Sequence, residues 1–322
     1  DHVYAMWSVF DGNSVKIHES ISRDRGQTFT APTQISVRSQ TGPATTYVYP
    51  SVDAAGNLYV ALASFASASG SVDADIYVTR STDDGETFSP WVKVAHSTGN
   101  PGDFVNGNFR DGILESFAAS QTYPGHLYVT YEQWDGTQMD VKLSESIDGG
   151  FVWRDRGIVN DATNSATTDQ FQPSVAAGVG GAVGVAFYDR RGTCPADQSV
   201  AAGNAGAGNT CADVTLQAYR ETGMGTYSTP AGSNARMTLN AFDPSQPVQH
   251  VDGLGQQACS AHRDPCTEVF LGDYFGLAVS AGNFYGLFVS THYPSNVKAD
   301  EGGRVYYQQQ VLATVPRAQL GL

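Results

Sequence analysis

Acidic and phenolic residues stand at the ends of apolar runs in this sequence, where the strands of a sheet would bring them together. Glu132 and Asp189 each close an apolar run, and Asp273 and Tyr274 stand just before one. Two carboxyl groups on either side of a glycosidic bond can hydrolyse it, one donating a proton and the other acting as base or nucleophile. We therefore predict four candidate catalytic residues: Asp189, Asp273, Tyr274 and Glu132.

Cationic and aromatic residues occupy the same kind of position. Arg110 stands at the start of a predicted strand, and Arg190 and Arg191 follow the run that Asp189 closes. A guanidinium can hold a substrate carboxylate with two hydrogen bonds. An alternative for Arg190 is a structural ion pair, with Asp273 as a candidate partner, and for His292 a hydrogen-bonded loop position. The candidate substrate-binding residues are Arg110, Arg190, Arg191, His292, Tyr293 and Trp134.

One short phrase, Ser-x-Asp-x-Gly-x-x-aromatic, occurs three times in the first half of the chain, at residues 22–29, 81–88 and 146–153. A phrase that recurs at a regular period indicates repeated supersecondary units. Each copy stands between two extended segments, and its residue types suit a hairpin turn. Asp and Ser side chains bond backbone N–H groups there, and Gly adopts a positive φ at little cost. We therefore interpret Asp24, Asp83 and Asp148 as turn-building residues.

These three phrases resemble the Asp-box of the sialidase-like (bacterial neuraminidase repeat) superfamily of β-propellers. The resemblance implies a propeller whose Asp-boxes lie on the face away from the active site. Sialidases use three arginines, a Tyr nucleophile with a Glu as its base, and an Asp acid/base. Tyr274 and Glu132 are the candidate counterparts of the Tyr and the Glu, but the family's Arg-Ile-Pro phrase is absent from this sequence. The resemblance therefore implies a carbohydrate-active protein whose glycan is not sialic acid.

The remaining sequence fits an all-β propeller of four-stranded antiparallel blades, arranged as a single domain over residues 1–322. With 35 Gly and few amphipathic helical patterns, the chain has the composition of a β-protein. Blades are predicted at about 49–95, 109–160, 170–240 and 268–312, with inner strands opening near residues 49, 109, 171 and 271. A first unit without an inner strand brings the recognisable units to five. Either the tail after residue 312 or a segment upstream of Asp1 would close the ring. We also expect that a sixth blade was once present.

Charge and hydropathy exclude several partners. The formal net charge of −14 opposes binding to nucleic acid or to an anionic membrane. No apolar run approaches the roughly 20 residues of a membrane span. The chain opens at Asp1 without an initiator Met, as a processed product would, and we expect a secreted protein whose partner is a glycan or polysaccharide.

Four cysteines support the same expectation. Pairing each cysteine with its nearest neighbour in the sequence predicts the disulfides Cys194–Cys211 and Cys259–Cys266, although four cysteines allow three connectivities. No metal or cofactor is required by the sequence. A cluster of acidic residues with the oxygen ligands that Ca²⁺ prefers lies at Asp73, Asp75, Asp83 and Asp84.

Three functions fit these residues. A glycoside hydrolase would use two of the carboxyl groups, and this is the function that we favour. A polysaccharide lyase would place an arginine on a uronate carboxylate and use His292, Tyr293 or Tyr274 as base and acid. The third possible function is that of a propeller that binds a glycan or a protein without cleaving it. Lyase products absorb in the ultraviolet, and binding without turnover would identify the third function.

Overall fold

The computed structural model describes residues 2–66, 73–99, 104–107, 109–112, 115–161, 168–196, 200, 202–244, 269–274, 276–292, 294–295, 305–306 and 308–322. Within these residues the only helices are the short turns α1 (Arg38–Thr41), η1 (Ala202–Asn204) and η3 (Arg317–Leu320), and the rest of the regular structure is β. The predicted all-β class is thus confirmed. No helix of the described chain has the length and hydropathy to cross a membrane.

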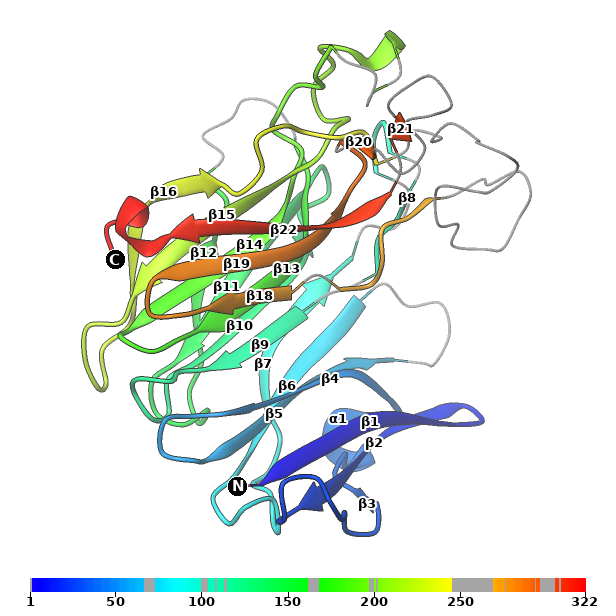
Figure 1. Cartoon of the computed structure of the whole chain (residues 1–322). Helices are drawn as coiled ribbons and strands as arrows, with labels where there is room; N and C mark the ends of the chain where they lie inside the picture. Colours follow the sequence, from blue (N-terminus) through cyan, green and yellow to red (C-terminus); the bar gives the residue numbers. More distant parts are fainter. Residues whose placement is uncertain are drawn as a thin grey trace.

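Strands that follow one another in the sequence pair antiparallel in consecutive units (Figure 1). The first unit has β1 (Val3–Asp11), β2 (Ser14–Ser22) and β3 (Thr33–Gln34). The second has β4 (Ala44–Val52), β5 (Leu58–Phe65), β6 (Asp73–Ser81) and β7 (Val92–Thr98). The third has β9 (Glu115–Ala119), β10 (Leu127–Trp134), β11 (Met139–Ser146) and β12 (Arg154–Ile158). The fourth has β13 (Gln170–Ala177), β14 (Ala182–Asp189), β15 (Asp213–Arg220) and β16 (Thr229–Arg236). The last has β18 (Gly276–Val279), β19 (Asn283–Ser290) and β22 (Gln309–Pro316).

The second, third and fourth units each have four antiparallel strands, as predicted, while the number of blades in a closed ring stays a prediction. In the first unit β1 pairs with β2, and a single parallel bridge from Val15 to Ala44 joins this unit to the second. The first strands of successive units lie beside one another: β4 beside β9, β9 beside β13 and β13 beside β18.

Apolar side chains fill the space between neighbouring sheets. Ile76 and Phe117 belong to one cluster between the second and third units, and Tyr128 and Val185 belong to another between the third and fourth. Because both faces of a central sheet are covered in this way, its strands need not alternate between apolar and polar residues. All eight residues of β14 are buried.

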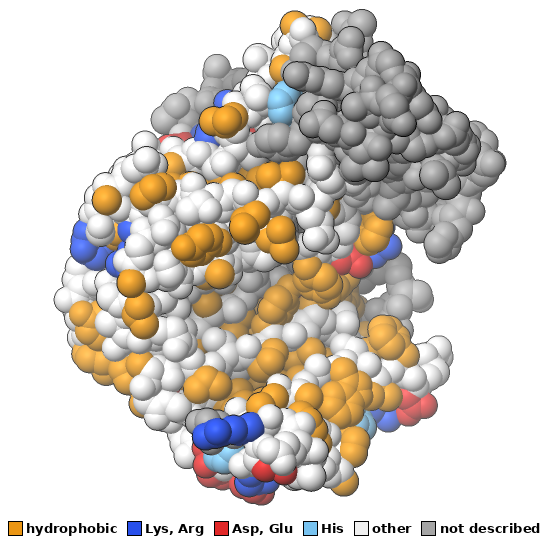
Figure 2. Space-filling view, viewed as in Figure 1, with side chains coloured by type: hydrophobic (Ala, Val, Ile, Leu, Met, Phe, Trp, Pro, Cys, Tyr) orange, Lys and Arg blue, Asp and Glu red, His pale blue; other side chains and the backbone are white. Residues whose placement is uncertain are grey.

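The last unit is covered less completely. Leu287 and Leu312 face each other across β19 and β22, and their exposed fractions are 45% and 65%. Apolar side chains are spread over the face that Figure 2 shows. Whether a further segment covers this face and closes the ring stays a prediction.

Two of the predicted inner strands begin later than expected. The segment at residues 109–113 does not open the third unit, because β8 (Phe109–Arg110) instead pairs in parallel with β17 (Val269–Phe270). The inner strand of the third unit is β9, and that of the last unit begins at Gly276. The rings of Phe104 and Phe171 pack on Phe109 and hold β8 in this place. A further short ladder joins β20 (Pro294–Ser295) to β21 (Val305–Tyr306).

Two inner strands carry a β-bulge near their first residues. The register of β4 shifts between Thr46 and Tyr49, and that of β13 shifts between Phe171 and Ser174. Tyr47 in the first bulge has a φ of 52°, and Gln172 in the second has a φ of 47°. Bulges redirect side chains at the rim of a sheet, and positive φ values for such residues are uncommon.

The three repeated phrases form turns with the same hydrogen bonds, which we call the Ser-Asp turns. The Ser81 hydroxyl donates to Asp83 Oδ1 (2.8 Å) and accepts from Gly85 N–H (2.9 Å). Corresponding bonds hold residues 22–29 and 146–153. Hydrogen bonds from Thr87 lower the pKa of Asp83 to about 2, so that this carboxylate has no proton to donate at neutral pH.

The disulfide Cys194–Cys211 is present as predicted. It lies in a small buried cluster and closes the loop between β14 and β15. Cys259 and Cys266 lie outside the described residues.

We expect the glycine of a Ser-Asp turn to stabilise the contact between units as well as the turn. Gly26 and Gly85 have nearly the same φ, 86° and 85°. A Cβ at Gly26 would meet nothing within 4 Å, whereas one at Gly85 would lie 2.8 Å from Ile21 Cδ1 in the first unit. Gly26→Ala should therefore lower the free energy of unfolding by about 1–2 kcal/mol, through backbone strain alone. Gly85→Ala should cost about 1 kcal/mol more, through overpacking.

Urea unfolding of the two variants beside the parent protein measures both losses. Equal losses would show that Gly85 acts only within its own turn.

Candidate active site

Polar side chains gather at the sheet edge opposite the Ser-Asp turns. Glu115 at the start of β9 pairs with Tyr131 near the end of β10. At the other end of β10, Leu127 pairs with Ser146, the first residue of the third Ser-Asp turn. The starts of inner strands and the ends of second strands therefore share one edge, and this turn lies at the other.

The parallel ladder of β8 and β17 brings Arg110 next to Asp273. Arg110 Nη2 donates to Asp273 Oδ1 at 3.1 Å, and the guanidinium lies 5.0 Å from the centre of the Phe270 ring. A Cβ at Gly112 would lie 3.6 Å from Arg110 Nε and 4.0 Å from Asp273 Oδ1, so the glycine leaves the pair uncovered on that side. The side chains of Arg110 and Asp273 are 41% and 32% exposed. A ligand can therefore reach this ion pair.

A pair of carboxyl groups lies behind the ion pair of Arg110 and Asp273. Glu132 at the end of β10 is 1% exposed, and its Oε1 accepts the backbone N–H of Gln172 from the bulge of β13. Its carboxyl group also shares a hydrogen bond with that of Asp111. Burial, together with the charge of Asp111, raises the pKa of Glu132. Burial likewise raises the pKa of Asp111, to about 6. Glu132 therefore retains a proton at neutral pH, whereas Asp111 retains its own proton only below about pH 6.

Three tyrosines stand around Asp273. The Tyr274 ring lies 6.4 Å from the rings of both Tyr47 and Tyr49, and Tyr274 is 59% exposed. Burial, with the charges of Tyr47 and Asp273, raises the pKa of Tyr274 to about 12. The pKa values of Tyr47 and Tyr49 are also raised, chiefly by burial. These phenols are neutral at pH 7 and act as hydrogen-bonding groups.

Glu115 is a further buried carboxyl group, which the sequence analysis did not predict. Its exposed fraction is 0%, and neither of its side-chain oxygens has a hydrogen-bond partner among the described residues. Burial raises its pKa well above the ordinary value. Its charge acts on the pKa of Tyr49 and Tyr274, which places it behind the tyrosines. The sequence feature that could have indicated Glu115 is its position as an acidic residue at the start of an apolar run.

The groups at this edge influence one another's protonation, and the pKa of Tyr47 depends on Asp273, Glu115, Arg110 and Asp111. We call the whole set the inner-strand cluster. It consists of Tyr47, Tyr49, Arg110, Asp111, Glu115, Glu132, Gln172, Asp273 and Tyr274. Of the candidates from the sequence, it unites Glu132, Asp273, Tyr274 and Arg110.

Arg190 lies inside the protein and has a structural position. Its exposed fraction is 0%, and Nη1 donates to Asp169 Oδ2 at 3.1 Å. Nη2 donates to the backbone oxygens of Asn106, Asn209 and Thr210. Its ion pair is thus with Asp169 and not with Asp273, because β17 places Asp273 beside Arg110 instead.

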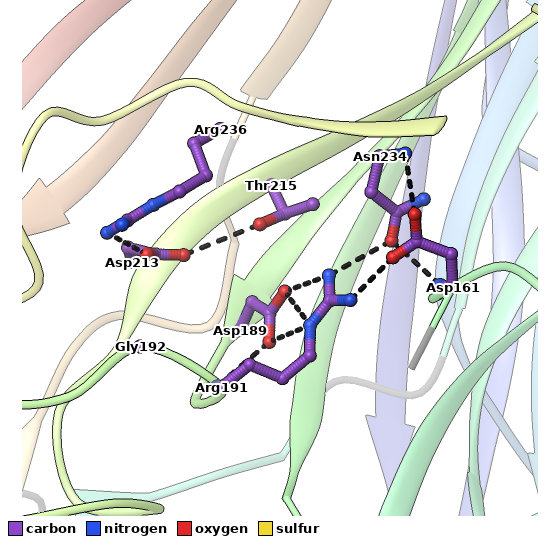
Figure 3. A pocket seen from close by; sticks show the side chains of 8 residues that line it. All are labelled: Asp161, Asp189, Arg191, Gly192, Asp213, Thr215, Asn234 and Arg236. Carbon is purple, nitrogen blue, oxygen red and sulfur yellow. Dashed lines mark hydrogen bonds and ion pairs between the residues drawn. The ribbon is translucent and has the colours of Figure 1, made fainter. Parts of the chain in front are cut away.

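Two other predicted residues, Asp189 and Arg191, lie in a separate cavity. This cavity is found where β14 and β16 end and β15 begins (Figure 3). Arg191 Nε donates to both oxygens of Asp189, at 3.0 and 2.7 Å. Arg191 Nη1 also donates to Asp161 at 2.5 Å. Asp189 is 2% exposed. This carboxylate is therefore occupied by Arg191 and is not part of the inner-strand cluster.

Trp134 and His292 have other contacts. Trp134, at the end of β10, packs half-buried against the core, and the backbone N–H of His292 donates to Ser290 Oγ. Tyr293 is outside the described residues. In the acidic cluster proposed for Ca²⁺, Asp75 pairs with Lys93 and His96. Among the described residues, no group of three or more His, Cys, Asp and Glu side chains has a metal-binding arrangement.

No protein-family model and no curated protein matches the sequence. Among solved structures, the chain is similar to the GH93 α-L-arabinofuranosidase of Fusarium graminearum with arabinobiose, at 12% identity and a TM-score of 0.46, over 100% of this chain and 91% of that one. A leech intramolecular trans-sialidase is similar at 15% identity and a TM-score of 0.44, over 95% of this chain and 37% of that one. The polysaccharide lyase Uly1 is similar at 8% identity and a TM-score of 0.46, over 98% of this chain and 56% of that one. Similarities this remote define neither a reaction nor a substrate.

The raised pKa of Asp111 predicts a specific dependence of stability on pH. Its folded pKa of about 6 lies above the ordinary value of 3.8, so the folded protein binds this proton more tightly than the unfolded chain. The contribution of Asp111 is therefore fully present below about pH 4 and is lost as the pH rises through 6. Relative to the parent protein, Asp111→Asn should become progressively more stable between pH 4 and pH 7.

Urea unfolding at several pH values measures this trend. Asp135→Asn is the matched control. Hydrogen bonds from Gln138 and Thr137 lower the pKa of Asp135 below 3.8, so its stability relative to the parent should stay constant between pH 4 and pH 7 and change, with the opposite sign, only at lower pH. A difference between Asp111→Asn and the parent that does not vary with pH would contradict the shared proton.

Proposed function

We propose that this protein is a glycoside hydrolase and that the reacting sugar binds at the inner-strand cluster. The observation that carries the proposal is the buried, proton-sharing pair of Asp111 and Glu132 beside the accessible pair of Arg110 and Asp273. Glycoside hydrolysis needs one carboxyl group that is protonated at neutral pH and a second that is ionised. Asp111 and Glu132 supply the proton in this proposal, and Asp273 is the base or nucleophile.

The environments of these carboxyl groups support their different roles. Glu132 is buried, one carboxylate oxygen of Asp111 is enclosed without a hydrogen-bond partner, and no described cation neutralises the two groups, so the protonated form is favoured. Asp273 forms an ion pair with the Arg110 guanidinium at the accessible side of the cluster. The exposed ring of Tyr274 lies beside Asp273 in the sequence and offers an apolar face with a hydroxyl at its edge. We assign it to sugar binding.

Elimination is less well supported than hydrolysis. A lyase needs a free cation for the uronate carboxylate and a base that accepts a proton at neutral pH. Arg110 is already paired with Asp273, and Arg190 is buried among its protein partners. Tyr274, with a pKa of about 12, is a weak candidate for a base because its phenol stays protonated. We therefore expect the substrate to be a glycan without a carboxylate at the cleavage point.

We also infer that the protein works outside the cytoplasm. The disulfide Cys194–Cys211 supports this, because disulfides persist mainly in oxidising compartments. The net charge of −14 agrees with a soluble protein that does not act on anionic polymers.

A panel of glycans tests the proposal. Arabinan, xylan, β-glucan, sialyllactose and polygalacturonate should be assayed both for new reducing ends and for ultraviolet absorbance of the products. We expect new reducing ends from a neutral glycan without added absorbance. Glu132→Gln should then lower kcat at least ~10²-fold, because it removes the proton-sharing partner of Asp111. The rate should fall as the pH rises above about 6, where Asp111 loses its proton.

Asp155→Asn is the control for this assay, since Asp155 lies on β12 and pairs with Lys142 at the exposed surface. Products that absorb in the ultraviolet would show that the protein cleaves its substrate by elimination and not by hydrolysis. Binding of a glycan without cleavage, weakened by Tyr274→Ala, would identify a binding protein. Cleavage that Glu132→Gln and Asp273→Asn leave unchanged would exclude the inner-strand cluster as the active site.

A further inference from the structure

A second polar cavity lies at the outer strands of the fourth unit. Its volume is about 320 Å³, and it is formed where β14 ends, β15 begins and β16 ends (Figure 3). The lining contains no large apolar side chain and consists of Asp161, Asp189, Arg191, Gly192, Asp213, Thr215, Asn234 and Arg236. A site of this size holds about one monosaccharide. The inner-strand cluster shares none of these residues.

One half of this cavity is a complete network of hydrogen bonds. Asp189 accepts two bonds from Arg191 Nε and one from the Gln170 side chain. Asp161 and the Asn234 side chain accept further bonds from the Arg191 guanidinium. The charge of Asp189 is therefore compensated within the protein, and Arg191 has few donors left for a ligand.

The other half is incomplete, and its centre is Asp213. This residue pairs directly with Asp189 across β14 and β15, so the two negative charges repel each other. The Asp213 side chain is 3% exposed, yet within the described chain its partners are the Thr215 hydroxyl at 3.4 Å and the guanidinium of Arg236. A carboxylate accepts about four hydrogen bonds. Asp213 thus has acceptor positions left, although it is buried.

Arg236 reaches Asp213 from the rim of the cavity. Its side chain is 50% exposed, so the guanidinium has room to turn toward the solvent. Burial raises the pKa of Asp213 to about 6, although the charges of Arg236 and Arg191 oppose this shift. The space beside it is kept open by Gly192, because a Cβ there would lie 3.2 Å from Asp213 Oδ2.

We propose that this cavity binds a sugar that carries a primary ammonium group, and that the ammonium pairs with Asp213 in place of Arg236. An ammonium group supplies three hydrogen-bond donors and a full positive charge, so it can replace the charge of Arg236 and also fill the acceptor positions that Asp213 has left. The polar lining suits a ligand with hydroxyl groups on all sides. An acidic ligand is disfavoured, because three carboxylates face two guanidinium groups and Arg191 is already committed. A metal ion is disfavoured too, since no metal-binding group of side chains is found among the described residues.

Four related sugars test the proposal by calorimetric titration at pH 7.5: glucosamine, N-acetylglucosamine, glucose and glucuronate. We expect glucosamine to bind at least ~10-fold more tightly than the other three, because it alone has an ammonium group. Asp213→Asn and Gly192→Ala should each abolish this preference, the first by removing the charge and the second by filling the space. Gly203→Ala is the matched control, because a Cβ at Gly203 would meet nothing within 4 Å.

Arg236→Gln distinguishes a binding site from a purely structural network. In the proposal, Arg236 competes with the ligand, so its removal should tighten glucosamine binding by about two- to fivefold. Weaker glucosamine binding in this variant, tighter binding of glucuronate, or no binding of any of the four sugars would each overturn the proposal. Because the readout is binding at a separate cavity, these results do not depend on whether the inner-strand cluster hydrolyses a glycan.

Discussion

The central sheets of this protein are covered on both faces by their neighbours, and this constraint determines where polar groups can lie. β14 is buried along its whole length, and β10 is buried up to Glu132. A charged side chain in the middle of such a strand would lose its hydration without a partner. Carboxyl groups are therefore confined to strand ends, where backbone N–H groups, arginines or water can reach them. The inner-strand cluster and the outer cavity both follow from this restriction.

The two clusters balance the cost of burying charge in different ways. In the inner-strand cluster the buried carboxyl groups outnumber the cations, and protons bound by Asp111 and Glu132 compensate for the missing positive charge. In the outer cavity Arg191 compensates Asp189 with direct hydrogen bonds. Protons exchange rapidly with a substrate and suit catalysis, whereas a guanidinium that holds a carboxylate in place suits recognition.

Local patterns in the sequence predicted the features that depend on neighbouring residues. The three Ser-Asp turns, the order of antiparallel units and the disulfide Cys194–Cys211 are of this kind. The composition of the site was predictable only in part. Arg110 meets Asp273 through a parallel ladder between distant segments, and Tyr47 depends on a bulge that no local pattern indicates. Arg190 and Arg191 are adjacent but point into different surroundings, and only the packing of Phe104 and Asp169 decides which one is buried.

The ladder between β8 and β17 also has a consequence for folding. Most pairs of strands in this chain join segments that follow each other closely, and such contacts can form early. Phe109 and Val269 are 160 positions apart, and the third and fourth units lie between them in the sequence. Arg110 and Asp273 therefore come together late, after most of the sheets have closed. A nascent chain would acquire its stability unit by unit, and its ability to recognise a ligand only at the end.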